Sequence, residues 1–153
     1  MTLAKIRGPY IQRERRYVIE WASIAYPTYK AFYNLRVGLA PEAIRAQYPG
    51  VDVERLGRVF KKFVDAVLVG EKEIILVEGK LRTPITAIGQ LIVYRDQLFT
   101  TPELQPYKGM PLRTILLCPV NDPSLDFMLR DARIEKAFYR PAWVDQYLKE
   151  VNR

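Results

Sequence analysis

Two apolar runs in the middle of the chain, residues 59–69 and 74–81, are rich in the branched side chains that favour β-strands. The four residues between them, GEKE, include a glycine and are typical of a β-hairpin loop. Both faces of each run are largely apolar. We therefore expect the hairpin to lie inside a sheet that helices cover on both sides.

The pattern outside the hairpin predicts alternating helices and strands. On the N-terminal side it predicts a helix over residues 10–25 that ends before Pro27, a strand over 30–39 closed by Gly38, and a short helix over 40–50. On the C-terminal side it predicts a helix over 83–98, a strand over 113–120, a helix over 122–132, a short edge strand over 133–140 and a closing helix over 141–151. The sequence thus predicts an α/β fold with a mixed central sheet between helices.

The helix predicted over residues 83–98 has a clear start and a polar stripe. Thr83 is a candidate N-cap, Pro84 suits the first helical position, and Ile88, Leu91, Ile92 and Leu98 follow helical apolar spacing. Gln90 and Tyr94 stand four residues apart and hence share one face, with Gln97 a turn further on. Polar groups on an otherwise apolar helix need a partner.

The amino-acid composition limits the kinds of site and partner that this chain can have. The 153 residues contain no repeat or linker that would divide them, so we expect a single domain over residues 1–153. One cysteine and no histidine exclude an internal disulfide framework, zinc fingers and His-based catalytic triads. The net charge of +7 favours a polyanionic partner, with nucleic acid the first candidate. No signal peptide or membrane span is evident, so we expect a cytoplasmic protein of a prokaryotic cell or a phage-infected host, without a membrane partner.

The hairpin carries two acids in unusual surroundings. If its loop is centred between residues 71 and 72, Asp65 lies directly opposite Glu78, with their Cβ atoms about 5 Å apart. Two such carboxylates repel each other unless one is protonated or a cation lies between them. Lys80 projects from the same face as Glu78, and the carbonyl of Gly79 adds an oxygen. This donor set suits Mg²⁺ or Mn²⁺ and predicts metal-assisted hydrolysis of a phosphodiester.

Structural roles for these residues stay open at this point. Asp65 alone could be a buried carboxylate that the backbone or an arginine satisfies. Glu78 and Lys80 could form an ion pair on an exposed strand end, because Glu-x-Lys occurs by chance in many proteins.

The combination of Asp65, Glu78-Gly79-Lys80 and Gln90-x-x-x-Tyr94 resembles the PD-(D/E)XK nuclease superfamily, in particular its RecB-like and lambda-exonuclease-like branch. The resemblance covers residues 55–100 and implies a restriction-endonuclease-like αβββαβ core. It implies that Asp65 and Glu78 are metal ligands, that Gly79 lends its carbonyl, and that Lys80 is the catalytic lysine. Gln90 and Tyr94 would contact DNA or order the site. Val64 departs from the proline of the family's name.

The resemblance also implies an acid from the first helix. Glu14 and Glu20 are the candidates, and we expect Glu20 because it lies nearer the apolar face. Basic residues that flank the site are candidates for contacts with DNA phosphates: Arg58, Lys61, Lys62 and Arg82. Arg13 and Arg16, with Arg15, form either a solvated face of the first helix or a track for phosphates.

These features predict a Mg²⁺- or Mn²⁺-dependent deoxyribonuclease that acts in recombination, repair or phage DNA processing, alone, as a homo-oligomer or in a larger DNA-processing complex. The alternative is a catalytically inactive nuclease fold that serves as a DNA-binding or structural module. Exonuclease, nickase, junction resolvase and restriction-like activities all remain open.

Overall fold

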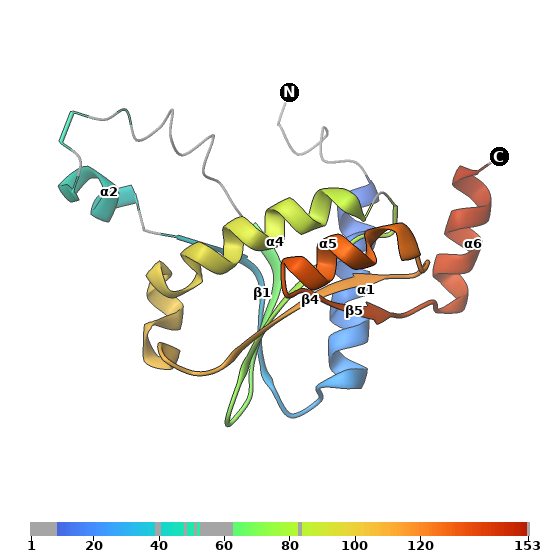
Figure 1. Cartoon of the computed structure of the whole chain (residues 1–153), viewed down its shortest axis with the longest axis horizontal. Helices are drawn as coiled ribbons and strands as arrows, with labels where there is room; N and C mark the ends of the chain where they lie inside the picture. Colours follow the sequence, from blue (N-terminus) through green and yellow to red (C-terminus); the bar gives the residue numbers. More distant parts are fainter. Residues whose placement is uncertain are drawn as a thin grey trace.

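The computed structural model describes residues 9–38, 41–47, 49–50, 52, 63–82 and 84–152. Within these ranges the chain forms a five-stranded sheet whose strands lie side by side in sequence order (Figure 1). The strands are β1 (Lys30–Arg36), β2 (Phe63–Val69), β3 (Ile74–Gly79), β4 (Leu112–Cys118) and β5 (Glu135–Phe138). The first three strands are antiparallel, and β3, β4 and β5 are parallel. This mixed sheet confirms the predicted α/β class.

Helices cover both faces of the sheet. They are α1 (Pro9–Ala25), α4 (Ile85–Gln97), α5 (Asp126–Asp131) and α6 (Ala142–Val151), whereas α2 (Pro41–Gln47) stands away from the sheet (Figure 1). Short 3₁₀ helices span Leu98–Thr100, Pro102–Tyr107 and Pro123–Leu125. The element order α1, β1, β2, β3, α4, β4 matches the αβββαβ core expected from the sequence, with α2 inserted between β1 and β2. Of the helices in the described ranges, none combines the length and hydropathy required to cross a bilayer.

Two hydrophobic cores lie on opposite faces of the sheet. On one face Val67 and Leu76 pack with Leu91 of α4. On the other face Leu68 and Ile75 pack with residues of α1 and α6. Successive strand residues therefore enter different cores, which explains why both hairpin strands are apolar at nearly every position.

The hairpin has the predicted register. Val69 pairs with Ile74 and Ala66 with Val77, so the ladder continued by one residue places Asp65 opposite Glu78. The Gly70 N–H donates to the Glu73 carbonyl across 2.9 Å and closes the predicted loop.

Several boundaries differ from the sequence prediction. The strand predicted over 30–39 ends at Arg36, and the edge strand predicted over 133–140 is confined to Glu135–Phe138. The helix predicted over 122–132 begins as a 3₁₀ turn, whose start Asp122 caps by accepting from the Ser124 N–H. Thr83 and residues 59–62 lie outside the described residues.

The buried face of α4 also differs from the prediction. The residues that face the sheet are Ala87, Ile88, Leu91 and Tyr94, whereas Ile92 is 37% exposed. One residue advances a helix by about 100°, so Ile92 turns away from the stripe to which Leu91 belongs. Pro84 occupies the position before the first helical residue, rather than the first position itself.

Candidate functional site

Asp65 and Glu78 meet where β2 and β3 lie side by side at the end of the sheet. Asp65 Oδ2 accepts a hydrogen bond from the Gly79 N–H at 2.8 Å, and Glu78 Oε2 lies 3.3 Å from the Asp65 N–H that donates to it. Glu78 is only 4% exposed. Burial raises the pKa of both carboxyls, and the charge of Asp65 raises the pKa of Glu78 further. The pair therefore favours a positive charge beside it.

Lys80 follows directly and is paired with an acid of α1. Its Nζ lies 3.8 Å from Glu14 Oε2, and the Leu81 N–H donates to Glu14 Oε1 at 3.3 Å. Glu14 is buried, and its charge adds to the rise in the pKa of Asp65. The structure thus brings Glu14 and Lys80 to the carboxylate pair.

Glycine at position 79 allows α1 to approach this closely. A Cβ atom at Gly79 would stand 2.4 Å from Val18 Cγ2 and 3.4 Å from Tyr17 Cδ1. Any larger residue would push the helix away, and Glu14 with it. The glycine of the Glu-x-Lys stretch is therefore a packing requirement in addition to its predicted role as a carbonyl donor.

Glu20, the acid expected at the site, lies elsewhere. It accepts hydrogen bonds from the Tyr139 hydroxyl at 2.5 Å and from Trp143 Nε1 at 3.1 Å. Glu14 lies one helical turn before Val18 and shares its buried face. Glu20 follows Glu14 by six residues, which is a rotation of about 240° around the helix axis, and so it points toward β5 and α6. The sequence does not separate the two acids because both border apolar positions, and the packing of α1 places Glu14, not Glu20, beside Lys80.

Gln90 and Tyr94 extend the site from α4. Tyr94 is buried, and burial together with the charges of Glu78 and Asp65 raises its pKa to about 12. The Gln90 side-chain oxygen is buried and has no hydrogen-bond partner among the described residues. Of the polar stripe predicted on this helix, Tyr94 faces the sheet near the carboxylates, and Gln90 keeps one buried acceptor without a partner among the described residues.

The carboxylate pair fits a hard divalent cation. Three or more acids or cysteines do not converge into a complete metal cage anywhere in the described part of the chain. Mg²⁺ does not require such a cage, because it is commonly held by one or two carboxylates together with water and substrate phosphates. Two adjacent carboxylates, Glu78 buried and Asp65 half-buried, are with the predicted Gly79 carbonyl a donor set of this kind.

The predicted phosphate-binding residues have different surroundings. Arg82 is exposed and makes no ion pair with the described residues. Arg13 lies over the Tyr147 ring at 4.6 Å and Arg16 over the Trp143 ring at 4.2 Å, so both stack on α6. Arg58, Lys61 and Lys62 lie outside the described residues.

The sequence groups Arg15 with Arg13 and Arg16 as a possible phosphate track, without choosing it as a site residue. It is exposed, and its charge lowers the pKa of Asp65. Its position immediately after Glu14 is the signal that would have found it, once Glu14 is known to face the site.

The sequence matches no protein-family model, and it matches no curated protein. Among solved structures, the fold is similar to the crystal structure of a repair endonuclease from Pyrococcus abyssi, with a TM-score of 0.51 and 20% sequence identity. The match covers 85% of this chain and 47% of that chain, so this chain spans about half the length of the endonuclease. At this identity the likeness concerns the fold alone. It agrees with the expected nuclease fold, while membership of the RecB-like branch stays a prediction.

Proposed function

We propose that this protein is a metal-dependent nuclease that hydrolyses phosphodiester bonds of DNA. The observation that carries the proposal is the adjacent pair of half-buried Asp65 and buried Glu78, with Lys80 directly after the same strand and Glu14 beside it. Such a group of charges is costly to bury and lowers stability unless a ligand compensates it. The fold shared with a repair endonuclease supports the proposal and suggests DNA repair as the process.

Mg²⁺ or Mn²⁺ is the proposed cofactor, held by Asp65, Glu78 and the Gly79 carbonyl. When bound, the ion would lower the pKa of a coordinated water and neutralise charge on the phosphate. Softer metals are disfavoured because the sequence has no histidine and because the described residues place no cysteine at this site.

The protein's own groups would position the reactants. Lys80 would hold its ammonium group against the attacked phosphate, where it stabilises the negative charge that develops as water bonds to phosphorus and the leaving oxygen departs. The ion pair with Glu14 fixes where that ammonium lies. Tyr94, whose pKa is raised to about 12, stays protonated at neutral pH and can donate a hydrogen bond to a phosphate oxygen. Gln90 would bring a further amide to the same region.

Positive charge would bring DNA to the site. The chain carries a net charge of +7, exposed Arg15 acts on the pKa of Asp65, and exposed Arg82 follows Lys80 by two residues. Contacts of this kind attract the phosphate backbone without selecting a base sequence.

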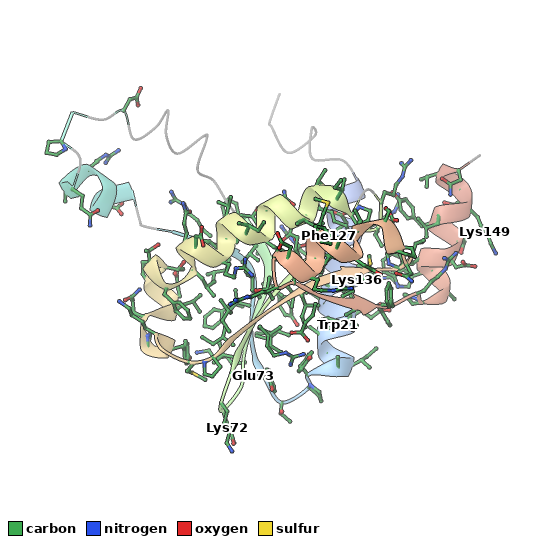
Figure 2. All side chains as sticks on the ribbon, in the orientation of Figure 1. Trp21, Lys72, Glu73, Phe127, Lys136 and Lys149 are labelled. Atoms are coloured by element: carbon green, nitrogen blue, oxygen red, sulfur yellow. The ribbon has the colours of Figure 1, made fainter. Side chains whose placement is uncertain are left out.

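The test is cleavage of labelled linear duplex, single strand, nicked circle and four-way junction with Mg²⁺ or Mn²⁺. Lys80→Ala is compared with Lys72→Ala, whose side chain lies at the far tip of the hairpin (Figure 2). We expect the wild type and Lys72→Ala to cut, and Lys80→Ala to cut at least about 100-fold more slowly.

Retained cutting by a clean preparation of Lys80→Ala would overturn the assignment of this site. DNA binding without cutting on any substrate, and without a metal-induced rise in melting temperature, would instead establish the alternative, a nuclease fold that only binds DNA.

A further inference from the structure

A cleft of about 360 Å³ opens beside Lys80. It lies between the end of β3, the turn after β4 and the C-terminal end of α6. Clefts that hold small ligands in proteins range from about 300 to 1,000 Å³, so this one is large enough for one nucleotide but not for a duplex. Of its lining residues, the nuclease reaction proposed above uses Lys80 and Arg82 but none of the apolar or amide side chains.

The floor of the cleft is apolar. Leu81, Cys118 and Leu148 line it, and each is at least nine-tenths buried. Val120 stands at the edge and is 49% exposed. An apolar floor that remains open to solvent suits the face of a base or the carbon side of a sugar, because covering it removes apolar surface from water.

The rim of the cleft is polar and carries charges of both signs. Arg82 is exposed and forms no ion pair with the described residues. The Asn121 side-chain oxygen accepts from Lys136 Nζ at 2.8 Å, which holds this amide in place and leaves its NH₂ group as a donor. Asn152 adds a second amide from α6. Asp122 adds one carboxylate, whose Oδ1 accepts hydrogen bonds within its own turn. The rim therefore offers Arg82 for a phosphate and hydrogen-bonding groups for a base.

The cleft is continuous with the carboxylate site through Lys80. Lys80 both lines the cleft and pairs with Glu14. Arg82 follows two residues later, so its Cα lies within about 7 Å of that of Lys80. A nucleotide whose phosphate touches Lys80 can reach the cleft without any movement of the backbone.

We propose that this cleft binds the base and sugar of the nucleotide adjoining the phosphate that is cut, with Arg82 on its phosphate side and Asn121 and Asn152 at its base edge. The proposal rests on the proposed function for the identity of the ligand, a deoxynucleotide. It adds a binding subsite and makes Val120 and Arg82 residues that affect substrate affinity rather than the chemical step.

The test is equilibrium binding of deoxyadenosine monophosphate without metal, followed by changes in amide NMR signals. Two variants alter the cleft: Val120→Trp fills it and Arg82→Ala removes its charge. Their matched controls are Val93→Trp and Arg130→Ala, exposed residues of α4 and α5 that do not line the cleft. We expect each cleft variant to weaken binding by at least tenfold (about 1.4 kcal/mol) and each control to leave it unchanged.

Signals that shift at residues 118–121 and 148–152 on addition of the nucleotide would support the proposal. Equal binding to the wild type and Val120→Trp, no binding at millimolar nucleotide, or equally strong binding of inorganic phosphate alone would overturn it.

Asp65→Asn separates this proposal from the proposed function. If Asp65→Asn still binds the nucleotide and the wild type cuts no DNA, the result would support the binding subsite and contradict the proposed nuclease function. A different outcome would be that the wild type cleaves DNA, that Val120→Trp has the same KM, and that neither binds the nucleotide. This outcome would contradict the proposed subsite and would leave the proposed nuclease function supported.

Discussion

At the scale of single residues, two acids of α1 have different surroundings although both border its apolar face. Glu14 is buried beside Lys80 and Leu81, whereas Glu20 is bound by Tyr139 and Trp143. Only Glu14 is close enough to the carboxylate pair to affect the pKa of Asp65. We infer that Glu14 positions Lys80 and that Glu20 joins α1 to β5 and α6.

The two acids give a matched pair of variants. Glu14→Gln keeps an acceptor for the Leu81 N–H but removes the charge that holds Lys80, so we expect single-turnover cleavage to slow by about 10- to 100-fold. Glu20→Gln should leave cleavage within about twofold of the wild type. The reverse ranking would contradict the placement of Glu14 at the reactive site.

The surroundings of Glu20 also predict how the stability of the fold depends on pH. The Tyr139 hydroxyl, the Trp143 N–H and Arg16 lower the pKa of Glu20 in the folded protein. A lowered pKa gives stability that is present above the unfolded pKa of about 4.3 and is lost as pH falls through the folded value. We expect the wild type to melt about 2 to 4 °C above Glu20→Gln at pH 7, and this difference to shrink below about pH 4.

Thermal unfolding monitored by circular dichroism from pH 3 to 7 measures this difference. Glu103→Gln, at an exposed position, is the control and should follow the wild type at every pH. A difference between the wild type and Glu20→Gln that stays constant down to pH 3 would refute the role given to these hydrogen bonds.

At the scale of elements, the contact between α1 and β3 decides whether the site forms. The strand carries Glu78 and Lys80, the helix carries Glu14, and Gly79 is the point where they touch. A side chain at this point separates the two elements, and packing this tight does not relax without cost.

We therefore expect Gly79→Ala to destabilise the fold by about 1 to 3 kcal/mol, or to lower the melting temperature by about 2 to 12 °C. The control is Gly89→Ala on α4, where an added Cβ has nothing within 4 Å and where replacing a helical glycine adds about 1 kcal/mol of stability. Val18→Ala in the Gly79→Ala background should recover part of the loss. Additive effects of the two substitutions would argue against a direct clash.

At the scale of the whole molecule, the sheet holds two carboxylates that repel each other at one of its ends. Asp65 and Glu78 are held together by strands that are buried on both faces, so the pair cannot separate without opening the sheet. Binding of the proposed divalent cation would relieve this repulsion and stabilise the folded state by mass action.

We expect Mg²⁺ or Mn²⁺ to stabilise the wild type by about 2.7 kcal/mol at a free ion concentration one hundred times Kd, and so to raise its melting temperature. Asp65→Asn should melt about 2 to 4 °C higher than the wild type without metal, because one buried charge is gone, and should show no metal-induced rise. Asp96→Asn on the exposed face of α4 is the control. A metal-induced rise of equal size in Asp65→Asn would exclude this pair as the metal site.

The sequence by itself determined the element order, the hairpin and its register. Runs that are apolar on both faces require a covered sheet, and a four-residue loop fixes the pairing of the strands it joins, so Asp65 opposite Glu78 follows from local chain geometry. Gln90 and Tyr94 were placed together for the same reason, since residues four apart on a helix are neighbours.

Tertiary structure alone decided which parts of distant elements meet. Three features depend on how a helix is rotated and placed against the sheet. They are the position of Glu14, the stacking of Arg13 and Arg16 on α6, and the cleft between β3, β4 and α6. Helical periodicity defines an apolar face but leaves both of its borders equivalent. The borders become different only when packing against Gly79 turns one of them toward the carboxylates.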